Sequence, residues 1–257
     1  MEICALASGS SGNCFYIENR KNSGILIDAG ITCKQIEERL GKIGKKPENI
    51  KAMFITHEHS DHIRGADVLG RKFNIPIFAT KKTIKSRFLC NDEKLINTIK
   101  NNETLQTAGL QIEAFSKSHR AEDPVSYNII NHKRVSIITD AGHACKNVIS
   151  NVADADFLFL ESNYDELMLK NGPYPSHVKA WIKSDIGHLS NTQSGLCVLE
   201  HGSRKLKNVV LSHISENNNM KELALKTFNS LIKERKDLRP NVSLSCKEAP
   251  TKVFRVN

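Results

Sequence analysis

The chain has 257 residues, of which 39% are hydrophobic and 25% charged, and its formal net charge is +9 at pH 7. These are the values of a globular protein with one substantial core, so the disordered and fibrous classes are excluded. No apolar run approaches the roughly 18–20 residues that cross a bilayer, and Glu2 places an acid where a signal peptide carries positive charge. We therefore predict a cytoplasmic protein without a membrane partner.

The predicted elements of the first half are short strands and helices in alternation. Apolar runs bounded by turns favour strands at residues 2–8, 14–18 and 24–28. Helical periodicity follows at residues 34–44 and ends at Gly44. A strand at 51–56, a helix through 64–73 and a strand at 75–79 come next.

The second half is again rich in strands, and a helix with a short β-like tail completes the chain. The expected strands are residues 110–115, 126–130, 135–140, 156–161 and 208–213. There is no repeat and no linker, so we predict one α/β domain over residues 1–257. Two sheets with helices outside fit this order better than one doubly wound sheet, because β-meanders dominate each half.

Cysteine usage and charge suggest a compartment and a partner. The seven cysteines are scattered, odd in number and never arranged as C-x-x-C, which predicts reduced, mostly buried thiols. The charge of +9 favours polyanions, nucleic acid first. The basic clusters at 81–87 and 232–239 are equally well interpreted as solvated helix faces.

The strongest chemical signal is H-E-H-S-D-H at residues 57–62, directly after a predicted strand. So much polarity next to a buried strand needs a partner, and imidazole and carboxylate groups are metal ligands. His57 and His59 are suited to one ion, and Asp61 and His62 to a second.

Four residues do not complete two metal sites, and further ligands are expected where other strands end. His119, Asp140 and His213 each follow a predicted strand, as expected of a site built along one sheet edge. The carboxylate of Asp140 can bridge two cations. Taken singly, each of the three is equally compatible with a structural role.

In order and spacing these motifs resemble those of the metallo-β-lactamase superfamily, beginning with Asp28 in L-I-D-A-G. More narrowly, L-A-S-G-S-S-G-N, T-H-E-H-S-D-H-I-R-G, S-H-R-A-E-D-P-V-S-Y, L-E-S-N-Y-D and G-H-L-S-N resemble the YycJ/WalJ-type proteins. That family is regarded as metal-dependent DNA exonucleases. The resemblance implies a four-layer αββα sandwich with the site at one edge.

Carried over by position, the resemblance also implies a ligand set. His57, His59 and His119 would hold the first metal, and Asp61, His62 and His213 the second, with Asp140 bridging. Asp28 would orient a histidine through its free ring N–H. Zinc, manganese and iron all accept such ligands.

The implied reaction is hydrolysis of a phosphodiester. Two cations about 3.5–4 Å apart lower the pKa of a bridging water and supply hydroxide, with Asp61 as an additional base. In the similar tRNA-processing enzymes a Glu–His pair occupies the places of Glu161 and His188, so we expect His188 to be the general acid, oriented by Glu161. The alternative for His188 is a helix-capping or core-packing histidine.

The turn A-S-G-S-S-G-N leaves two interpretations, and the substrate class leaves three. Ser10 and Asn13 are candidate phosphate contacts, and the alternative is a simple hairpin turn. The charge and the two-metal motifs favour DNA, with RNA as a further substrate. The alternatives are a glyoxalase II-like thioester or lactone hydrolase and a nucleic-acid-binding protein with structural metals.

Overall fold

The computed structural model describes residues 1–256, whose contacts divide into two compact units. Unit 1 comprises Met1–Ser116, Ala121–His132 and the segment from Cys246 onward. Unit 2 comprises Lys117–Arg120 and Lys133–Ser245. The single domain predicted from the sequence stays a prediction.

A seven-stranded sheet forms the framework of unit 1, in the order β14-β1-β2-β3-β4-β5-β6. Its strands are β1 (Glu2–Ala7), β2 (Cys14–Arg20), β3 (Ser23–Ile27), β4 (Ile50–Phe54), β5 (Ile77–Ala79), β6 (Ile96–Thr98) and β14 (Phe254–Arg255). Pairing is antiparallel from β14 to β3 and parallel from β3 to β6. The parallel strands therefore end at one edge of the sheet, where their loops carry candidate site residues.

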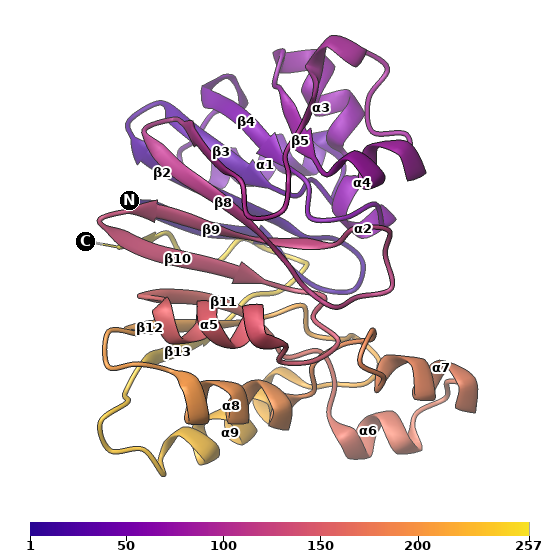
Figure 1. Cartoon of the computed structure of the whole chain (residues 1–257), viewed down its shortest axis with the longest axis vertical. Coiled ribbons are helices and arrows are strands. Elements are labelled where there is room, and N and C mark those ends of the chain that lie inside the picture. Colours follow the sequence, from indigo (N-terminus) through magenta and orange to yellow (C-terminus); the bar gives the residue numbers. More distant parts are fainter. Residues whose placement is uncertain (257) are drawn as a thin grey trace. The chain divides into compact units, whose positions relative to one another are not determined.

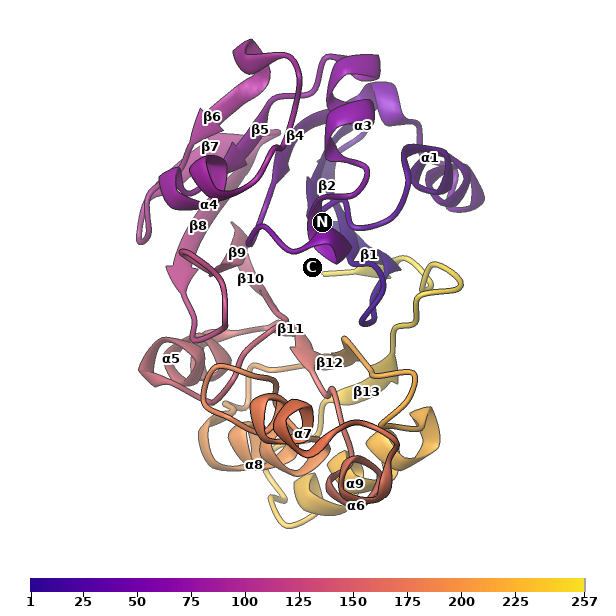
Figure 2. The ribbon, with the colours of Figure 1, turned by 90° about the vertical axis from the view of Figure 1, so that its right-hand side faces the viewer.

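Helices cover one face of this sheet. They are α1 (Cys33–Lys42), α2 (Ser60–Ile63), α3 (Ala66–Phe73) and α4 (Lys81–Ser86), with one-turn helices η1 (Pro47–Asn49) and η2 (Glu93–Leu95). A capping box between Thr32 and Gln35 begins α1. In both views α1 and α3 lie side by side (Figures 1 and 2), and they bury Ile36, Leu40 and Leu69 in one core with the sheet.

Three antiparallel strands of unit 1 lie against the other face: β7 (Thr104–Thr107), β8 (Leu110–Ser116) and β9 (Val125–Asn131). Tyr127 of β9 packs edge-on against Phe54 with ring centroids 5.6 Å apart, and its hydroxyl donates to the Ile55 carbonyl at 2.9 Å. The Val125 amide donates to the Thr56 carbonyl at 3.0 Å. These contacts hold the chain that leads from β4 into residues 57–62.

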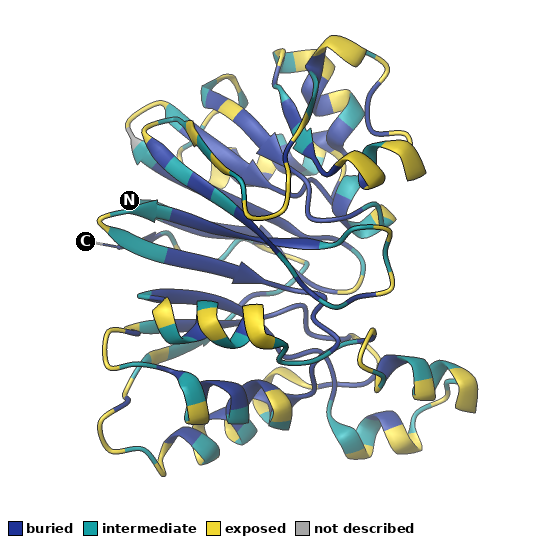
Figure 3. Cartoon of the chain, in the orientation of Figure 1, coloured by how far each residue is buried: buried dark blue, intermediate teal, exposed yellow. Residues whose placement is uncertain are grey.

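Unit 2 contains four parallel strands, in the order β13-β12-β11-β10. They are β10 (Lys133–Ile138), β11 (Phe157–Glu161), β12 (Asn208–Ser212) and β13 (Asn241–Leu244). The helices are α5 (Lys146–Asp154), α6 (Glu166–Asn171), α7 (Ser176–Ile182), α8 (Asn191–His201) and α9 (Lys221–Ile232). Every residue of β11 is buried, as expected of a central parallel strand, whereas the outer helices keep exposed faces (Figure 3).

Most strands and helices predicted from the sequence are confirmed, whereas helix α5, of nine residues, was not predicted. The strands β6 and β7 were not predicted, because runs of three or four residues carry little periodicity. Residues 81–86 do form a helix, but residues 233–239 follow the end of α9, so the helix-face interpretation is wrong for that cluster.

Two expectations about composition can be compared with the structure. All seven cysteines are free thiols, and five of them are buried, as predicted. Among the described residues, no helix combines the length and the apolar character needed to span a membrane.

A substitution at Gly30 tests the close packing of its backbone against the segment that carries Asp61. A Cβ at this position would lie 1.6 Å from the backbone oxygen of Asp61, so Gly30→Ala must displace the loop. We expect its free energy of unfolding to fall by at least about 2 kcal/mol, as measured by urea denaturation. In the control Gly41→Ala, the new methyl meets nothing within 4 Å on helix α1. The control should gain about 0.5–1 kcal/mol, and equal losses in both variants would contradict the packing argument.

Candidate metal centre

The H-x-H-x-D-H string begins three residues after β4 ends, and its imidazoles converge within unit 1. His57 and His62 are fully buried, with ring centroids 4.1 Å apart. The Nε2 atom of His57 lies 3.0 Å from Nδ1 of His59, and Nε2 of His62 lies 3.3 Å from Oδ2 of Asp61. His59 is the N-cap of the short helix α2, so the change from loop to helix turns Asp61 and His62 back toward His57.

Asp28 lies directly behind His62. Its Oδ2 atom is 2.7 Å from Nδ1 of His62, and its Oδ1 accepts the backbone N–H of Thr56 at 2.8 Å. A proton on Nδ1 donated to this carboxylate leaves Nε2 of His62 as an acceptor, which is the form that binds a metal. Asp28 adopts a left-handed backbone with φ of 60° at the end of β3.

Thr56 is a site residue that the sequence reasoning missed. Its hydroxyl lies 2.9 Å from Nδ1 of His57, 3.3 Å from Nδ1 of His62 and 3.0 Å from Oδ2 of Asp28. One buried hydroxyl therefore contacts the outward nitrogen of two histidines and the carboxylate that orients one of them. Its signal in the sequence was its position at the start of T-H-E-H-S-D-H-I-R-G, immediately before the string.

The turn between β1 and β2 places its two candidate residues differently. Ser10 is exposed, whereas Asn13 is buried, with its amide nitrogen 3.2 Å from Nε2 of His62 and 3.4 Å from Oδ2 of Asp61. Because β1 and β2 are antiparallel neighbours, the turn is also the connection of a hairpin. Asn13 thus supports the string directly, and its phosphate contact stays a prediction.

A second cluster lies in unit 2, where three parallel strands end side by side. Asp140 follows β10, Glu161 ends β11 and His213 follows β12. Together with His188, these residues offer ligand atoms that lie within 4.8 Å of one another. Oδ1 of Asp140 is 3.5 Å from Nε2 of His213 and 3.8 Å from Nδ1 of His188.

Glu161 contacts both histidines of this cluster and the backbone on either side of it. Its Oε1 lies 2.9 Å from Nδ1 of His188 and 2.8 Å from Nδ1 of His213, while Oε2 accepts the backbone N–H groups of Ala141 and Leu189. Burial alone would raise the pKa of Glu161, but the charges and hydrogen bonds of the two histidines lower it to about 2. The group is therefore a carboxylate at neutral pH.

His119 also belongs to unit 2 and points one nitrogen toward the cluster. Its Nδ1 is 3.0 Å from the Gly187 carbonyl, which leaves Nε2 3.7 Å from Oδ1 of Asp140. Burial lowers the pKa of His119 to about 3, against the opposing charge of Asp140. The imidazole is neutral at pH 7, as a metal ligand requires.

Two further neighbours of this cluster were not among the candidate residues. The Asn163 amide donates to the His213 carbonyl at 2.9 Å and lies 3.2 Å from Nδ1 of that histidine. The Trp181 ring packs edge-on against His188 with centroids 5.7 Å apart. Asn163 follows Glu161 by two residues within L-E-S-N-Y-D, and this position was its available signal.

Imidazole and carboxylate groups make up both clusters, without a thiol among the residues described above. Neutral histidines and ionised acids are the donor set of divalent zinc, manganese or iron. The residues therefore fit a divalent metal site.

The fold and these clusters define a class of protein. A family model described as the metallo-beta-lactamase superfamily matches residues 7–95. The structure of Zn²⁺-bound PqqB from Methylobacterium extorquens aligns with a TM-score of 0.74 at 16% identity, covering 98% of this chain and 100% of that one. The fold is the αββα sandwich of the metallo-β-lactamases, and the predicted fold class is confirmed.

Sequence relatives narrow the class further. Exodeoxyribonuclease WalJ of Streptococcus pneumoniae is 38% identical over 229 residues, covering 87% of this chain and 85% of the relative. Exodeoxyribonuclease YycJ of Bacillus anthracis is 32% identical over 241 residues, covering 91% and 90%. The chain belongs to the YycJ/WalJ-type family of the metallo-β-lactamase superfamily, as the motifs predicted.

Thr56 gives a test of the string's supporting contacts. Thr56→Val keeps the shape but removes the hydroxyl shared by Asp28, His57 and His62, so we expect manganese or zinc affinity to fall by about 10- to 100-fold. Calorimetric titration of metal-free protein measures this change.

The matched control is Thr139→Val, because Thr139 is also buried and also precedes a candidate ligand. Within residues 1–256, the Thr139 hydroxyl makes no hydrogen bond. Its removal should leave metal affinity unchanged, and a similar loss in both variants would refute the role of Thr56.

Proposed function

We propose that this protein is a metal-dependent phosphodiesterase that degrades DNA as an exonuclease. The carrying observation is the Asp140–Glu161–His188–His213 cluster, which combines metal ligands with a carboxylate–histidine pair. Two relatives covering most of the chain are exodeoxyribonucleases, and the net charge of +9 suits a polyanionic substrate. DNA as substrate also agrees with the cytoplasmic location predicted from sequence.

The ligand assignment is part of this proposal. His57, His59 and His119 would bind one divalent ion, and Asp61, His62 and His213 a second, with Asp140 shared. Motif order and family membership support the assignment, together with the geometry inside each unit. When bound, such a pair of zinc or manganese ions would activate water and offset charge on the phosphodiester.

His188 is proposed as the general acid for the departing oxygen. Glu161 holds Nδ1 of His188 and orients the ring, so Nε2 is the atom that would carry the transferred proton. The His188 side chain is 11% exposed, whereas those of Asp140, Glu161 and His213 are 2% exposed or less. Within this cluster, His188 is therefore the group that substrate reaches most easily.

The nuclease proposal predicts metal-dependent loss of end-labelled linear DNA. Purified protein should degrade it with manganese or zinc, stop with chelator and recover on adding metal. Asp61→Asn should lower the rate by about 100-fold or more, because a ligand and candidate base is lost. Glu58→Gln, from the same string, keeps an oxygen for the Glu122 amide and should retain activity. Thioester hydrolysis without DNA cleavage would contradict the proposal and favour the glyoxalase-like alternative.

The role of His188 predicts a dependence on the leaving group. His188→Asn should slow DNA hydrolysis by about 100- to 10,000-fold, but slow a p-nitrophenyl phosphodiester far less, because nitrophenolate departs without a proton. Initial rates on both substrates measure the difference. The exposed His177 supplies the control, and His177→Asn should leave both rates unchanged. An equal loss on both substrates would show that His188 does not act as the acid.

A further inference from the structure

Helix α4 and the loop after it form a basic surface with an aromatic centre, which the proposed metal chemistry does not use. Lys81, Lys82, Lys85 and Arg87 are all exposed, and residues 81–91 contain no acid. Across the described residues 1–256, none of these four cations forms an ion pair. In the middle of this charge lies Phe88, whose side chain is 62% exposed.

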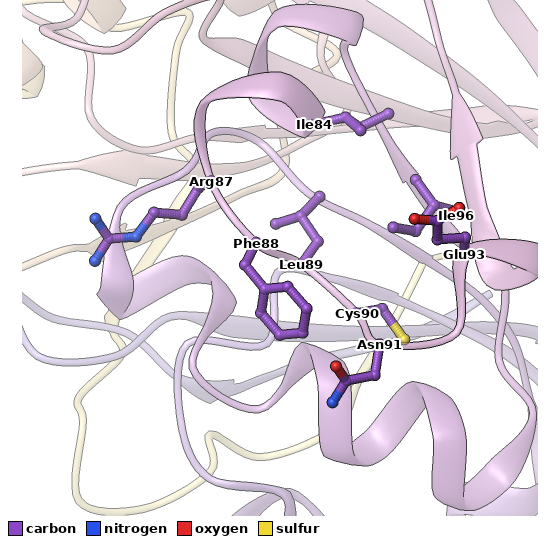
Figure 4. Close-up of a pocket in the computed structure, with 8 residues that line it drawn as sticks. All are labelled: Ile84, Arg87, Phe88, Leu89, Cys90, Asn91, Glu93 and Ile96. Carbon is purple, nitrogen blue, oxygen red and sulfur yellow. The ribbon is translucent and has the colours of Figure 1, made fainter.

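Beside Phe88 lies a pocket of about 470 Å³, and its apolar lining includes Ile84, Leu89 and Ile96 (Figure 4). Asn91 and Glu93 supply its polar groups. In Figure 4 the Arg87 side chain extends away from Glu93, with the Phe88 ring lying between them. One wall is thus cationic, the centre is aromatic, and the opposite wall offers hydrogen-bond acceptors.

This surface lies at the same sheet edge as the H-x-H-x-D-H string. Strands β4 and β5 are parallel neighbours, so the chain leaves β4 for His57 and leaves β5 for Thr80, the N-cap of α4, on one side of the sheet. The loop that carries Glu122 and Asp123 contacts both segments. The Thr80 hydroxyl donates to the Asp123 carbonyl, and the Glu58 carboxylate accepts the Glu122 amide. Both features belong to unit 1.

We propose that the surface of α4, Phe88 and the adjacent pocket binds an unpaired strand of the DNA substrate. A base stacks on Phe88, the flanking phosphates contact Lys85 and Arg87, and the base edge reaches Asn91 or Glu93. The inference rests on the proposed nuclease function and deepens it, because it specifies the form of DNA that the protein holds.

Two physical arguments favour an unpaired strand over an intact duplex. A paired base hides both faces in its stack and presents only its edges in the grooves, so it cannot cover an exposed phenyl ring. An unpaired base can stack on an aromatic side chain while cations follow its phosphates. The carboxylate of Glu93 repels a phosphate from the pocket and accepts the amino group of cytosine or adenine, so the base enters the pocket and the backbone remains on the cationic side.

The test measures fluorescence anisotropy of a labelled single-stranded oligonucleotide with chelator present, which prevents cleavage. Phe88→Ala should raise the Kd by about 5- to 100-fold, the loss expected for one stacked base. Phe88→Trp should bind as the wild type does, and its additional indole fluorescence should be quenched by the oligonucleotide. The apolar control is Leu167→Ala, a change at another exposed side chain on α6.

A second pair of variants tests the phosphate contacts. Arg87→Gln should lower the slope of log Kd against log salt by about 0.7, the value for one lost contact on a single strand. Lys226→Gln changes the net charge equally from an exposed position on α9, and it should leave the slope unchanged. A blunt duplex should show a smaller effect of Phe88→Ala than the single strand does.

The outcomes separate this inference from the proposed function. If the wild type cleaves DNA but Phe88→Ala and Leu167→Ala bind the single strand with equal Kd, the inference is overturned and the nuclease stands. If the wild type cleaves no DNA with any metal, the proposed function fails, whatever Phe88 does. If Phe88→Ala changes only the sedimentation of the protein, a second copy covers this face and the inference is also overturned.

Discussion

A single buried carboxylate, that of Glu161, holds the cluster of Asp140, His188 and His213 in unit 2 together. It accepts hydrogen bonds from the backbone beside Asp140 and beside His188, and it lies within hydrogen-bonding distance of the imidazoles of His188 and His213. A charge with four donors around it tolerates burial that an unpaired charge would not. The hydrogen bonds that stabilise this one carboxylate therefore also help to fix the positions of Asp140, His188 and His213.

Unit 1 uses the same physical device with different residues. Asp28 is buried at the end of β3 and lies against His62, and the Thr56 hydroxyl extends this contact to His57. In each unit, an acid at a strand end fixes one ring nitrogen of a histidine and leaves the other as an acceptor. The folded core therefore already holds these histidines in the orientation that metal binding requires.

Sequence reasoning found converging side chains where a predicted strand is followed by a carboxylate or an imidazole. Asp140 and His213 could be placed near one another because parallel strands end at the same sheet edge. Thr56, Asn163 and Trp181 were missed because a hydroxyl, an amide or an indole has no characteristic spacing. The partner of Asn163 lies 50 residues away in the chain. Strands as short as β6 and β7 obtain their pairing from neighbours, so their own residues carry little pattern.

Three of the proposed site residues share a conformation that most residues avoid. Asp28, Asp140 and His213 have φ angles of 60°, 52° and 54°. Glycine would relax each position, and asparagine tolerates this region well, but neither supplies the carboxylate of Asp28 and Asp140 or the imidazole of His213. At these three positions, the backbone conformation therefore favours one residue type and the chemistry of the site requires another. Selection for stability alone would therefore replace these side chains early, and it would give a more stable but inactive protein.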